Sequence, residues 1–170
     1  NKIANGLTQN EFDELINDDD KPFFDRAAQG RYSPASTIKP AIGLFGIDKD
    51  ILDWEYTIQD PGFFILPEDG RIYRGWKKGG HGEINLKDAI IESSNTFFFS
   101  LAYQTEIEEL RAHLSNFGFG KNVCDDCFMP DNGLLPSPRW KMNTHNFGWF
   151  KGDTVNVGVG QGYINATPIQ

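Results

Sequence analysis

The sequence has no long hydrophobic run and is short of positive charge. No stretch of it approaches the roughly 18 consecutive apolar residues that span a bilayer, and residues 1–6 lack the apolar core of a signal peptide. We therefore expect a chain that is soluble as given, with any membrane anchor outside it. Lys and Arg total 16 against 24 Asp and Glu, for a net charge of −8. Such an acidic chain, without a basic stripe, argues against nucleic acid as a partner.

Cysteine is also scarce, with copies at Cys124 and Cys127 only. A Cys-x-x-Cys pair can be a redox couple, half of a zinc site, a tight disulfide or two unrelated thiols. No second pair is present to complete a zinc ribbon, so we expect either inert thiols or a simple disulfide.

The chain does contain enough apolar and aromatic residues for one packed core. Hydrophobic residues make up 39% and aromatic residues 14%, including 14 Phe, which fits a globular domain and not a disordered one. The 170 residues suffice for one domain, and on size alone we expect no second full domain. We find no internal repeat and expect one domain over residues 1–170.

The residue pattern predicts a mainly helical chain with one small β-hairpin. Capping boxes at 8–11 and 105–108 mark the starts of two helices. The hairpin places strands 63–66 and 71–76 around a turn at 67–70. Helices are expected at 8–16, about 36–44, 85–92, 96–103 and 107–117, with a glycine-rich loop at 77–82, a long irregular stretch at 121–152 and a helix start at 167–168.

Ser36 and Lys39 form the sharpest local signal, because residues three apart share one face of a helix. A hydroxyl that is inert at its own pKa becomes a nucleophile beside a base that takes its proton. A lysine is such a base only when neutral, a state that burial favours. Pro40 suits a first helical turn, so we expect the helix, with its positive end, to begin at about Ser36. Alone, the tetrad is weak, since an exposed serine and lysine on a helix match it equally well.

The triplet Ser93-Ser94-Asn95 strengthens this signal. A Ser-x-Asn type of element accompanies Ser-x-x-Lys in penicillin-binding proteins and related β-lactamases. The same residues also suit the N-cap of a helix, and both interpretations can hold together.

Segment 32–40, Tyr-Ser-Pro-Ala-Ser-Thr-Ile-Lys-Pro, resembles the active-site serine segment of the class B penicillin-binding proteins. The specificity of the resemblance comes from the sum of several motifs, because no single motif would carry it. Further motifs are similar to the elongation-specific branch of that family, the penicillin-binding protein 2 group. In order along the chain, these motifs lie at 80–82, 93–98, 117–120, 133–137, 149 with 152–154, 158–163 and 166–170.

The resemblance implies a peptidoglycan D,D-transpeptidase that cross-links stem peptides during cell elongation. In this family's terms, Ser36 attacks the D-Ala-D-Ala carbonyl and Lys39 takes its proton. Ser93 passes a proton to the leaving D-alanine, and Asn95 bonds to Lys39 and to the substrate amide. The acyl-enzyme is then taken by an amine of a neighbouring stem peptide, whereas a β-lactam acylates Ser36 and stays attached.

The resemblance also implies a location and partners. The location is the periplasmic side of the bacterial inner membrane. The partners are peptidoglycan stem peptides, β-lactam antibiotics and membrane proteins of the elongation machinery, such as a RodA-type glycosyltransferase, bound through parts absent from this sequence. No nucleic acid is expected.

The sequence departs from the family in lacking its Lys-Thr-Gly element. In the family this element follows the segment that resembles 166–170, on a strand that lines the active site, and the first sheet strands precede the segment that resembles the start of this chain. We therefore expect the helical half of the α+β penicillin-binding-protein and serine β-lactamase fold, with the central antiparallel sheet largely missing. Residues 1–170 are then a single partial transpeptidase domain, with little activity alone and apolar surface that favours self-association.

No cofactor or metal is expected. Some members of the branch hold zinc with two Asp, one His and one Cys, and Asp60 and His81 match two of those positions. Gly75 and Ser94 occupy the other two, and neither is a good ligand. We expect His81 to be hydrogen-bonded within the turn at 79–82, and we assign no function to the other two histidines.

Two other functions stay open. A serine β-lactamase or D,D-carboxypeptidase shares the Ser-x-x-Lys helix, but a β-lactamase also needs a base that activates water, and nothing marks Glu83 or Glu92 for that task. A non-catalytic interaction module of the cell-wall machinery explains the missing Lys-Thr-Gly element. It leaves the set of four site residues unexplained.

Overall fold

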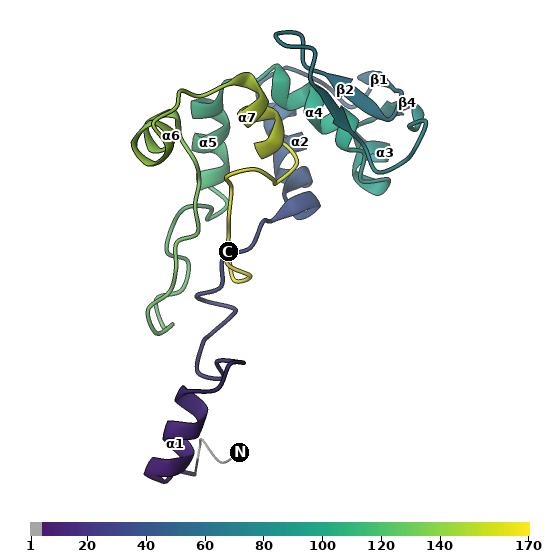
Figure 1. The fold of residues 1–170 in the computed structure, drawn as a ribbon. Helices are drawn as coiled ribbons and strands as arrows, with labels where there is room; N and C mark the ends of the chain where they lie inside the picture. The colour runs from purple at the N-terminus through teal and green to yellow at the C-terminus, as the bar shows by residue number, and fades with distance from the viewer. Residues whose placement is uncertain (1–4) are drawn as a thin grey trace.

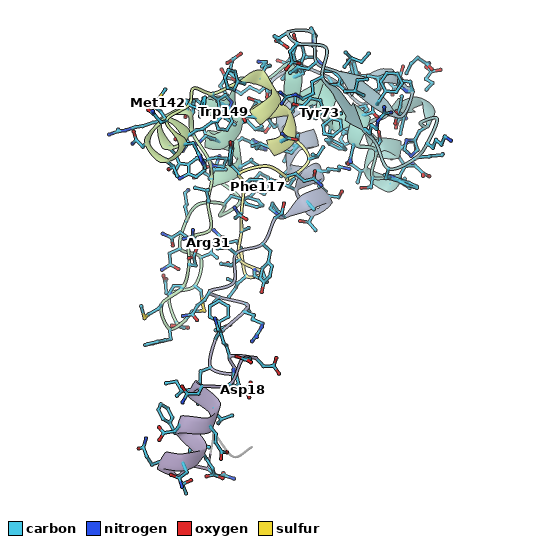
Figure 2. All side chains as sticks on the ribbon, in the orientation of Figure 1. Asp18, Arg31, Tyr73, Phe117, Met142 and Trp149 are labelled. Carbon is cyan, nitrogen blue, oxygen red and sulfur yellow. A yellow bond between two sulfur atoms is a disulfide. The ribbon has the colours of Figure 1, made fainter. Side chains whose placement is uncertain are left out.

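The computed structural model describes residues 5–170, which form a helical body and an N-terminal arm (Figure 1). Helix α1 (Gln9–Ile16) lies at the far end of the arm, apart from the other helices. Thr8 Oγ1 accepts the N–H of Glu11, and the Glu11 carboxylate accepts the N–H of Thr8. The first predicted capping box is therefore confirmed. Asp18 lies on this arm and Arg31 lies nearer the body (Figure 2).

The body combines short helices with two small sheets. Strand β1 (Thr57–Asp60) pairs antiparallel with β4 (Gly82–Asn85), and β2 (Phe63–Ile65) pairs antiparallel with β3 (Ile72–Arg74). The β2–β3 pair is the predicted hairpin, and the mainly helical fold class is confirmed. In chain order the elements are the 3-10 turn η1 (Ala35–Ile38), α2 (Lys39–Asp48), β1 (Thr57–Asp60), β2 (Phe63–Ile65), β3 (Ile72–Arg74), β4 (Gly82–Asn85), α3 (Leu86–Ile91), α4 (Asn95–Tyr103), α5 (Ile107–Ser115), α6 (Pro138–His145) and α7 (Lys151–Val157).

Helix α4 is the centre of the core. Its side chains Phe97, Phe98 and Leu101 are almost fully buried, as expected for a helix that is apolar on most of its surface. It contacts α2, α3, α7 and both small sheets. Helix α5 packs against α2 and buries Leu110 and Leu114. The core therefore fixes α2 relative to the start of α4, where the site residues lie.

Several local predictions were wrong. Residues 82–85 form strand β4, whereas the sequence pattern predicts that a loop ends at 82 and a helix begins at 85. The second capping box is not formed, because Glu106 is the N-cap of α5 and its side chain makes no capping bond. Thr105 Oγ1 donates instead to the carbonyl of Ala102, at 2.8 Å.

Two predictions for the C-terminal half also fail. The stretch expected to be irregular contains helix α6, whose start is capped by Ser137 Oγ accepting the N–H of Trp140 at 3.0 Å. Residues 168–169 lie in a turn, so no helix starts at 167–168.

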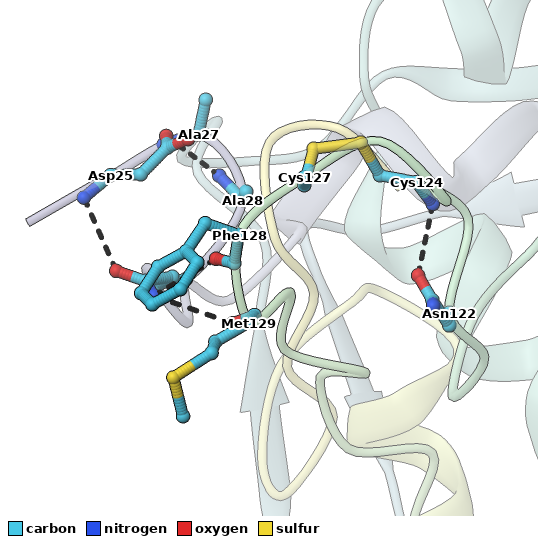
Figure 3. Close-up of a disulfide and its surroundings, with 9 residues drawn as sticks. Asp25, Ala27, Ala28, Asn122, Cys124, Cys127, Phe128 and Met129 are labelled. Atoms are coloured by element: carbon cyan, nitrogen blue, oxygen red, sulfur yellow. Dashed lines mark hydrogen bonds between the residues drawn. A yellow bond between two sulfur atoms is a disulfide. The ribbon is translucent and has the colours of Figure 1, made fainter.

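A disulfide joins Cys124 and Cys127, whose Cα atoms are 5.4 Å apart (Figure 3). This agrees with the expected simple disulfide. The residues that follow it dock on the arm, where Gln29 Nε2 donates to the carbonyls of Phe128 and Met129. The loop that contains the disulfide is thereby tied to the segment that leads into the body.

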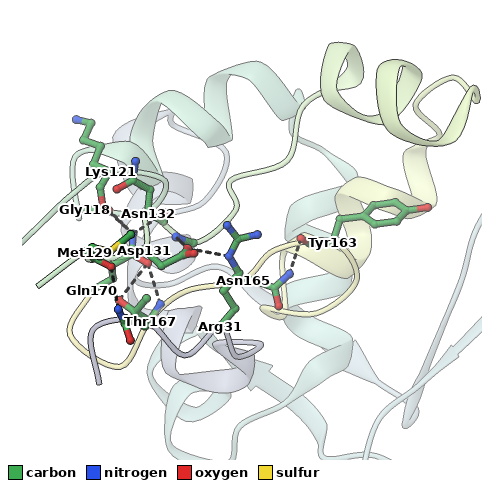
Figure 4. Close-up of polar contacts among 12 residues, drawn as sticks. Arg31, Gly118, Lys121, Met129, Asp131, Asn132, Tyr163, Asn165, Thr167 and Gln170 are labelled. Atoms are coloured by element: carbon green, nitrogen blue, oxygen red, sulfur yellow. Dashed lines mark hydrogen bonds and ion pairs between the residues drawn. The ribbon is translucent and has the colours of Figure 1, made fainter. Parts of the chain in front are cut away.

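The side chain of Gln170 bonds to three backbone carbonyls in other parts of the chain (Figure 4). Its side-chain Nε2 donates to the carbonyls of Gly118, Lys121 and Asn132. Close by in the sequence, the backbone of Ala166 pairs with that of Tyr32, just before η1. These contacts brace the segment that enters the 3-10 turn.

Candidate active site

Ser36 lies in the 3-10 turn η1, and its side chain is exposed. The predicted helix start is thus a 3-10 turn, with the α-helix proper beginning at Lys39. The turn rests on the loop after α7, where the N–H of Ala35 donates to the carbonyl of Gly160 at 2.9 Å. Gly160 has a φ of 68°, and a Cβ there would overlap the backbone of Ala35. Glycine at position 160 is therefore what lets the two turns meet.

Lys39 is almost completely buried, with 1% of its surface exposed. Its Nζ donates to Ser93 O at 2.7 Å, to Ser93 Oγ at 3.1 Å and to Asn95 Oδ1 at 2.7 Å. Loss of solvent lowers the pKa of Lys39 from 10.5 to about 8. Burial therefore shifts Lys39 toward the neutral form that a general base requires.

Ser93 links Lys39 to Ser36. Its Oγ lies 2.9 Å from Ser36 Oγ and accepts a hydrogen bond from Lys39 Nζ. The sequence led us to expect direct contact between Ser36 and Lys39, whereas the hydrogen bonds pass through Ser93. Because hydroxyl hydrogens rotate to suit their partners, the same geometry allows Ser36 to donate to Ser93, and Ser93 to a neutral Lys39.

The turn 93–95 connects α3 to α4. Ser93 has a φ of 52°, in a left-handed region that residues other than glycine seldom adopt. Ser94 is the N-cap of α4, and its Oγ accepts the N–H of Phe97 at 3.2 Å. Asn95 begins the helix. The structure thus brings together Ser36, Lys39, Ser93 and Asn95, the four residues named from the sequence, while Ser94 caps the helix between them.

Behind this turn, Asp60 is the centre of a buried polar cluster. The residue ends β1 and is 2% exposed. Its Oδ2 accepts from His81 Nδ1 and from Ser94 Oγ, each at 2.7 Å, and its Oδ1 accepts the N–H of Gly62 at 2.7 Å. Burial acts to raise the pKa of Asp60, but the hydrogen bonds from His81, Ser94 and Gly62 outweigh it and hold that pKa below its usual value.

The position of His81 corrects one prediction. Its ring bonds to Asp60 and not within the turn at 79–82. No local sequence signal marks this contact, because it depends on the pairing of β1 with β4. The contact of Asp60 with Ser94 was missed for the same reason.

The other candidate groups are structural. Within residues 5–170, no group of three or more His, Cys, Asp or Glu side chains has the arrangement of a metal site. Gly75 donates its N–H to the carbonyl of Gly62. His113 Nε2 lies 3.0 Å from the carbonyl of Ala41, and His145 packs against the ring of Trp140.

Comparison with known proteins finds matches along nearly the whole chain. Residues 4–170 match the family model of the penicillin binding protein transpeptidase domain. The peptidoglycan D,D-transpeptidase MrdA of Acinetobacter baumannii is 42% identical over 170 residues, covering all of this chain and 25% of that protein. MrdA of Escherichia coli K12 is 38% identical, covering all of this chain and 27% of that protein. The chain thus spans about a quarter of the length of the curated relatives it matches.

Solved structures agree with the sequence matches. Pseudomonas aeruginosa PBP2, solved in complex with WCK 5153, has a TM-score of 0.91 and 40% identity over 96% of this chain and 37% of that chain. Helicobacter pylori PBP2, solved in complex with MreC, has a TM-score of 0.88 and 33% identity over 97% of this chain and 31% of that chain. By sequence and by fold, the chain belongs to the penicillin-binding protein transpeptidase family.

Proposed function

We propose that this chain is part of a peptidoglycan D,D-transpeptidase, which cross-links stem peptides through a serine acyl-enzyme during cell elongation. The observation that carries the proposal is the hydrogen-bonded path from exposed Ser36 through Ser93 to buried Lys39. The relatives named as D,D-transpeptidases match the chain from end to end and are about four times as long. Their length supports our proposal that residues 1–170 are a single partial transpeptidase domain.

In the first step, Ser36 Oγ attacks the carbonyl carbon between the two terminal D-alanines of a stem peptide. Its proton passes along Ser93 to neutral Lys39, following the 2.9 Å and 3.1 Å contacts. The C–N bond then breaks, and Lys39 returns the proton through Ser93 to the nitrogen of the leaving D-alanine. The peptide remains as an ester on Ser36.

In the second step, an amine of a neighbouring stem peptide attacks this ester and gives up a proton to the same base. A new amide forms, and Ser36 regains its hydroxyl proton. Asn95 accepts from Lys39 at 2.7 Å, and we assign its side-chain amide to substrate binding with Ser93. A β-lactam follows only the first step, because its leaving nitrogen stays tethered to the acyl group.

A peptide that ends in D-Ala-D-Ala, offered together with an amine acceptor, tests this function in a chain extended to the length of the relatives. The expected product joins the donor acyl group to the acceptor and releases one D-alanine per bond. Hydrolysis of the donor without transfer would favour a D,D-carboxypeptidase. Repeated turnover of a chromogenic cephalosporin would favour a β-lactamase, and a folded chain that does none of these would contradict the enzyme proposal.

The pH dependence of acylation should follow the ionisation of Lys39. Burial lowers the pKa of this lysine to about 8, and only the neutral amine accepts the proton of Ser36. The acylation rate constant should therefore rise with pH through about 8, and at about two units below that it should be about 100-fold under its plateau. Rapid-quench acylation by a β-lactam across neutral and alkaline pH measures the profile, and a flat profile would exclude Lys39 as the base.

We place the whole protein at the periplasmic side of the inner membrane, as for the branch that the chain resembles. Among residues 5–170, no helix is both long and apolar enough to cross a membrane. The Helicobacter pylori relative was solved with MreC, which supports an assembly with other proteins here as well. A RodA-type glycosyltransferase, bound through other parts of the protein, is the partner we propose.

A further inference from the structure

The turn that carries Ser93 and Asn95 is held by two separate sets of hydrogen bonds. In the first set, Lys39 bonds to the carbonyl and hydroxyl of Ser93 and to the amide oxygen of Asn95. Ser94, the residue between them, is fully buried, and its Oγ donates to Asp60 Oδ2 at 2.7 Å. The residue between Ser93 and Asn95 is therefore held by a carboxylate whose hydrogen bonds go to Gly62, His81 and Ser94.

Backbone contacts on both sides of Asp60 hold its carboxylate in place. Asp60 lies opposite Gly82 in the β1–β4 pair, and its backbone carbonyl accepts the N–H of His81 at 3.1 Å. A Cβ built on Gly80 would overlap the backbone of Asp60, so the loop packs against the strand at van der Waals contact. The second carboxylate oxygen is held by the N–H of Gly62.

His81 provides a second connection to the same turn. Its side chain is 6% exposed and donates from Nδ1 to Asp60. Its ring packs edge-on against Trp76, with ring centres 5.7 Å apart. The indole N–H of Trp76 donates to the carbonyl of Glu92, one residue before Ser93, at 3.0 Å. Asp60, His81 and Trp76 therefore hold the turn at two residues, Glu92 and Ser94.

We infer that Asp60, through Ser94 and with the support of His81, positions Ser93 and Asn95 for acylation. This inference rests on the proposed function. Ser93 is held at a positive φ, a conformation that persists only where its surroundings enforce it. Release of Ser94 lets the turn relax and moves the hydroxyl that links Ser36 to Lys39. A displacement of about 1 Å in such a site costs about 10²-fold in rate.

The variant Asp60→Asn tests this inference in a chain extended to the length of the relatives. The substitution keeps the size of the side chain but turns one of its two acceptor oxygens into an N–H donor, so the three donors around it can no longer all be satisfied. At saturating β-lactam, we expect the acylation rate constant to fall about 10- to 100-fold, with labelling still close to one per chain. Ser94→Ala removes the hydroxyl that donates to Asp60 and should act in the same direction.

Asp131→Asn is the matched control. Asp131 also accepts the N–H two residues along the chain, from Gly133 at 2.7 Å, and pairs with Arg31 at 2.7 Å, but it lies on the loop beside the arm (Figure 4). If Asp60 only stabilises the fold, its replacement should lower the fraction of protein that the β-lactam can label. If Asp60 positions the site, its replacement should lower the acylation rate constant of the protein that is labelled. The Asp131 variant should keep the wild-type rate.

Two results would overturn the inference. One is an Asp60→Asn chain that acylates within about twofold of the wild-type rate. The other is a loss of labelled fraction with the rate unchanged. If Asp60→Asn does not fold, the same two outcomes for Ser94→Ala decide. Wild-type protein that is not acylated at Ser36 would instead refute the proposed function itself, so the two failures are distinguishable.

Discussion

Replacement of Lys39 by methionine is expected to lower the acylation rate constant about 10²- to 10⁴-fold. Methionine fills the buried volume of the lysine stem but has no basic nitrogen to take the proton of Ser36. It also leaves Asn95 Oδ1 and the carbonyl of Ser93 without the donor that now lies 2.7 Å from each. Rapid-quench labelling with a β-lactam, in a chain extended to the length of the relatives, measures the loss.

Lys141→Met separates catalysis from stability in that experiment. Lys141 is also a buried lysine, 4% exposed, with Nζ 2.6 Å from Asp153 Oδ2 and close to the ring of Phe150. Its replacement should lower the melting temperature, because Asp153 loses its partner, and should leave the acylation rate of the folded protein unchanged. An equal loss of rate in both variants would show that Lys39 acts only through stability.

The local signals in the sequence predicted the elements that depend on neighbouring residues. The capping box at the start of α1 formed because it needs only residues three apart. The signals for helix α4 and for the β2–β3 hairpin, a run of apolar residues and a turn, also depend only on neighbouring residues. The four site residues were named together because the resemblance joined motifs that lie far apart in the chain.

What the sequence did not predict depends on contacts between distant segments. Strand β4 exists because it pairs with β1, and glycine at its start had favoured a loop. The same pairing brings His81 to Asp60. At the second expected capping box, Thr105 donates to the carbonyl of Ala102 at the end of α4, and the N-cap of α5 is Glu106, whose side chain makes no capping bond.

The path from Ser36 to Lys39 shows how a contact between distant segments changes a chemical conclusion. Residues three apart share a face in an α-helix and also in the 3-10 turn that the chain forms over Ala35–Ile38 before α2 begins, so the turn itself does not separate the two side chains. The buried amine of Lys39 meets the turn after α3, so Ser93 becomes the link. Its proposed role as a proton relay came from the family resemblance, whereas its place between the other two residues required the fold.

Replacement of Ser36 by alanine is expected to abolish covalent labelling by penicillin. The side chain of Ser36 is exposed, whereas Lys39, its proposed base, is buried, which is the arrangement that an accessible nucleophile needs. Alanine removes the only atom that forms the ester and leaves the buried core of α2 and α4 in place. The loss should therefore be complete in a protein that melts at the wild-type temperature.

Intact mass after incubation with excess penicillin tests the central claim most directly, on residues 1–170 and on a chain extended to the length of the relatives. We predict one adduct per extended chain, lost in Ser36→Ala, and little adduct on residues 1–170, where the Lys-Thr-Gly element is absent. A folded extended chain that gains no mass, or an adduct that persists in Ser36→Ala, would contradict the assignment of Ser36 as the nucleophile.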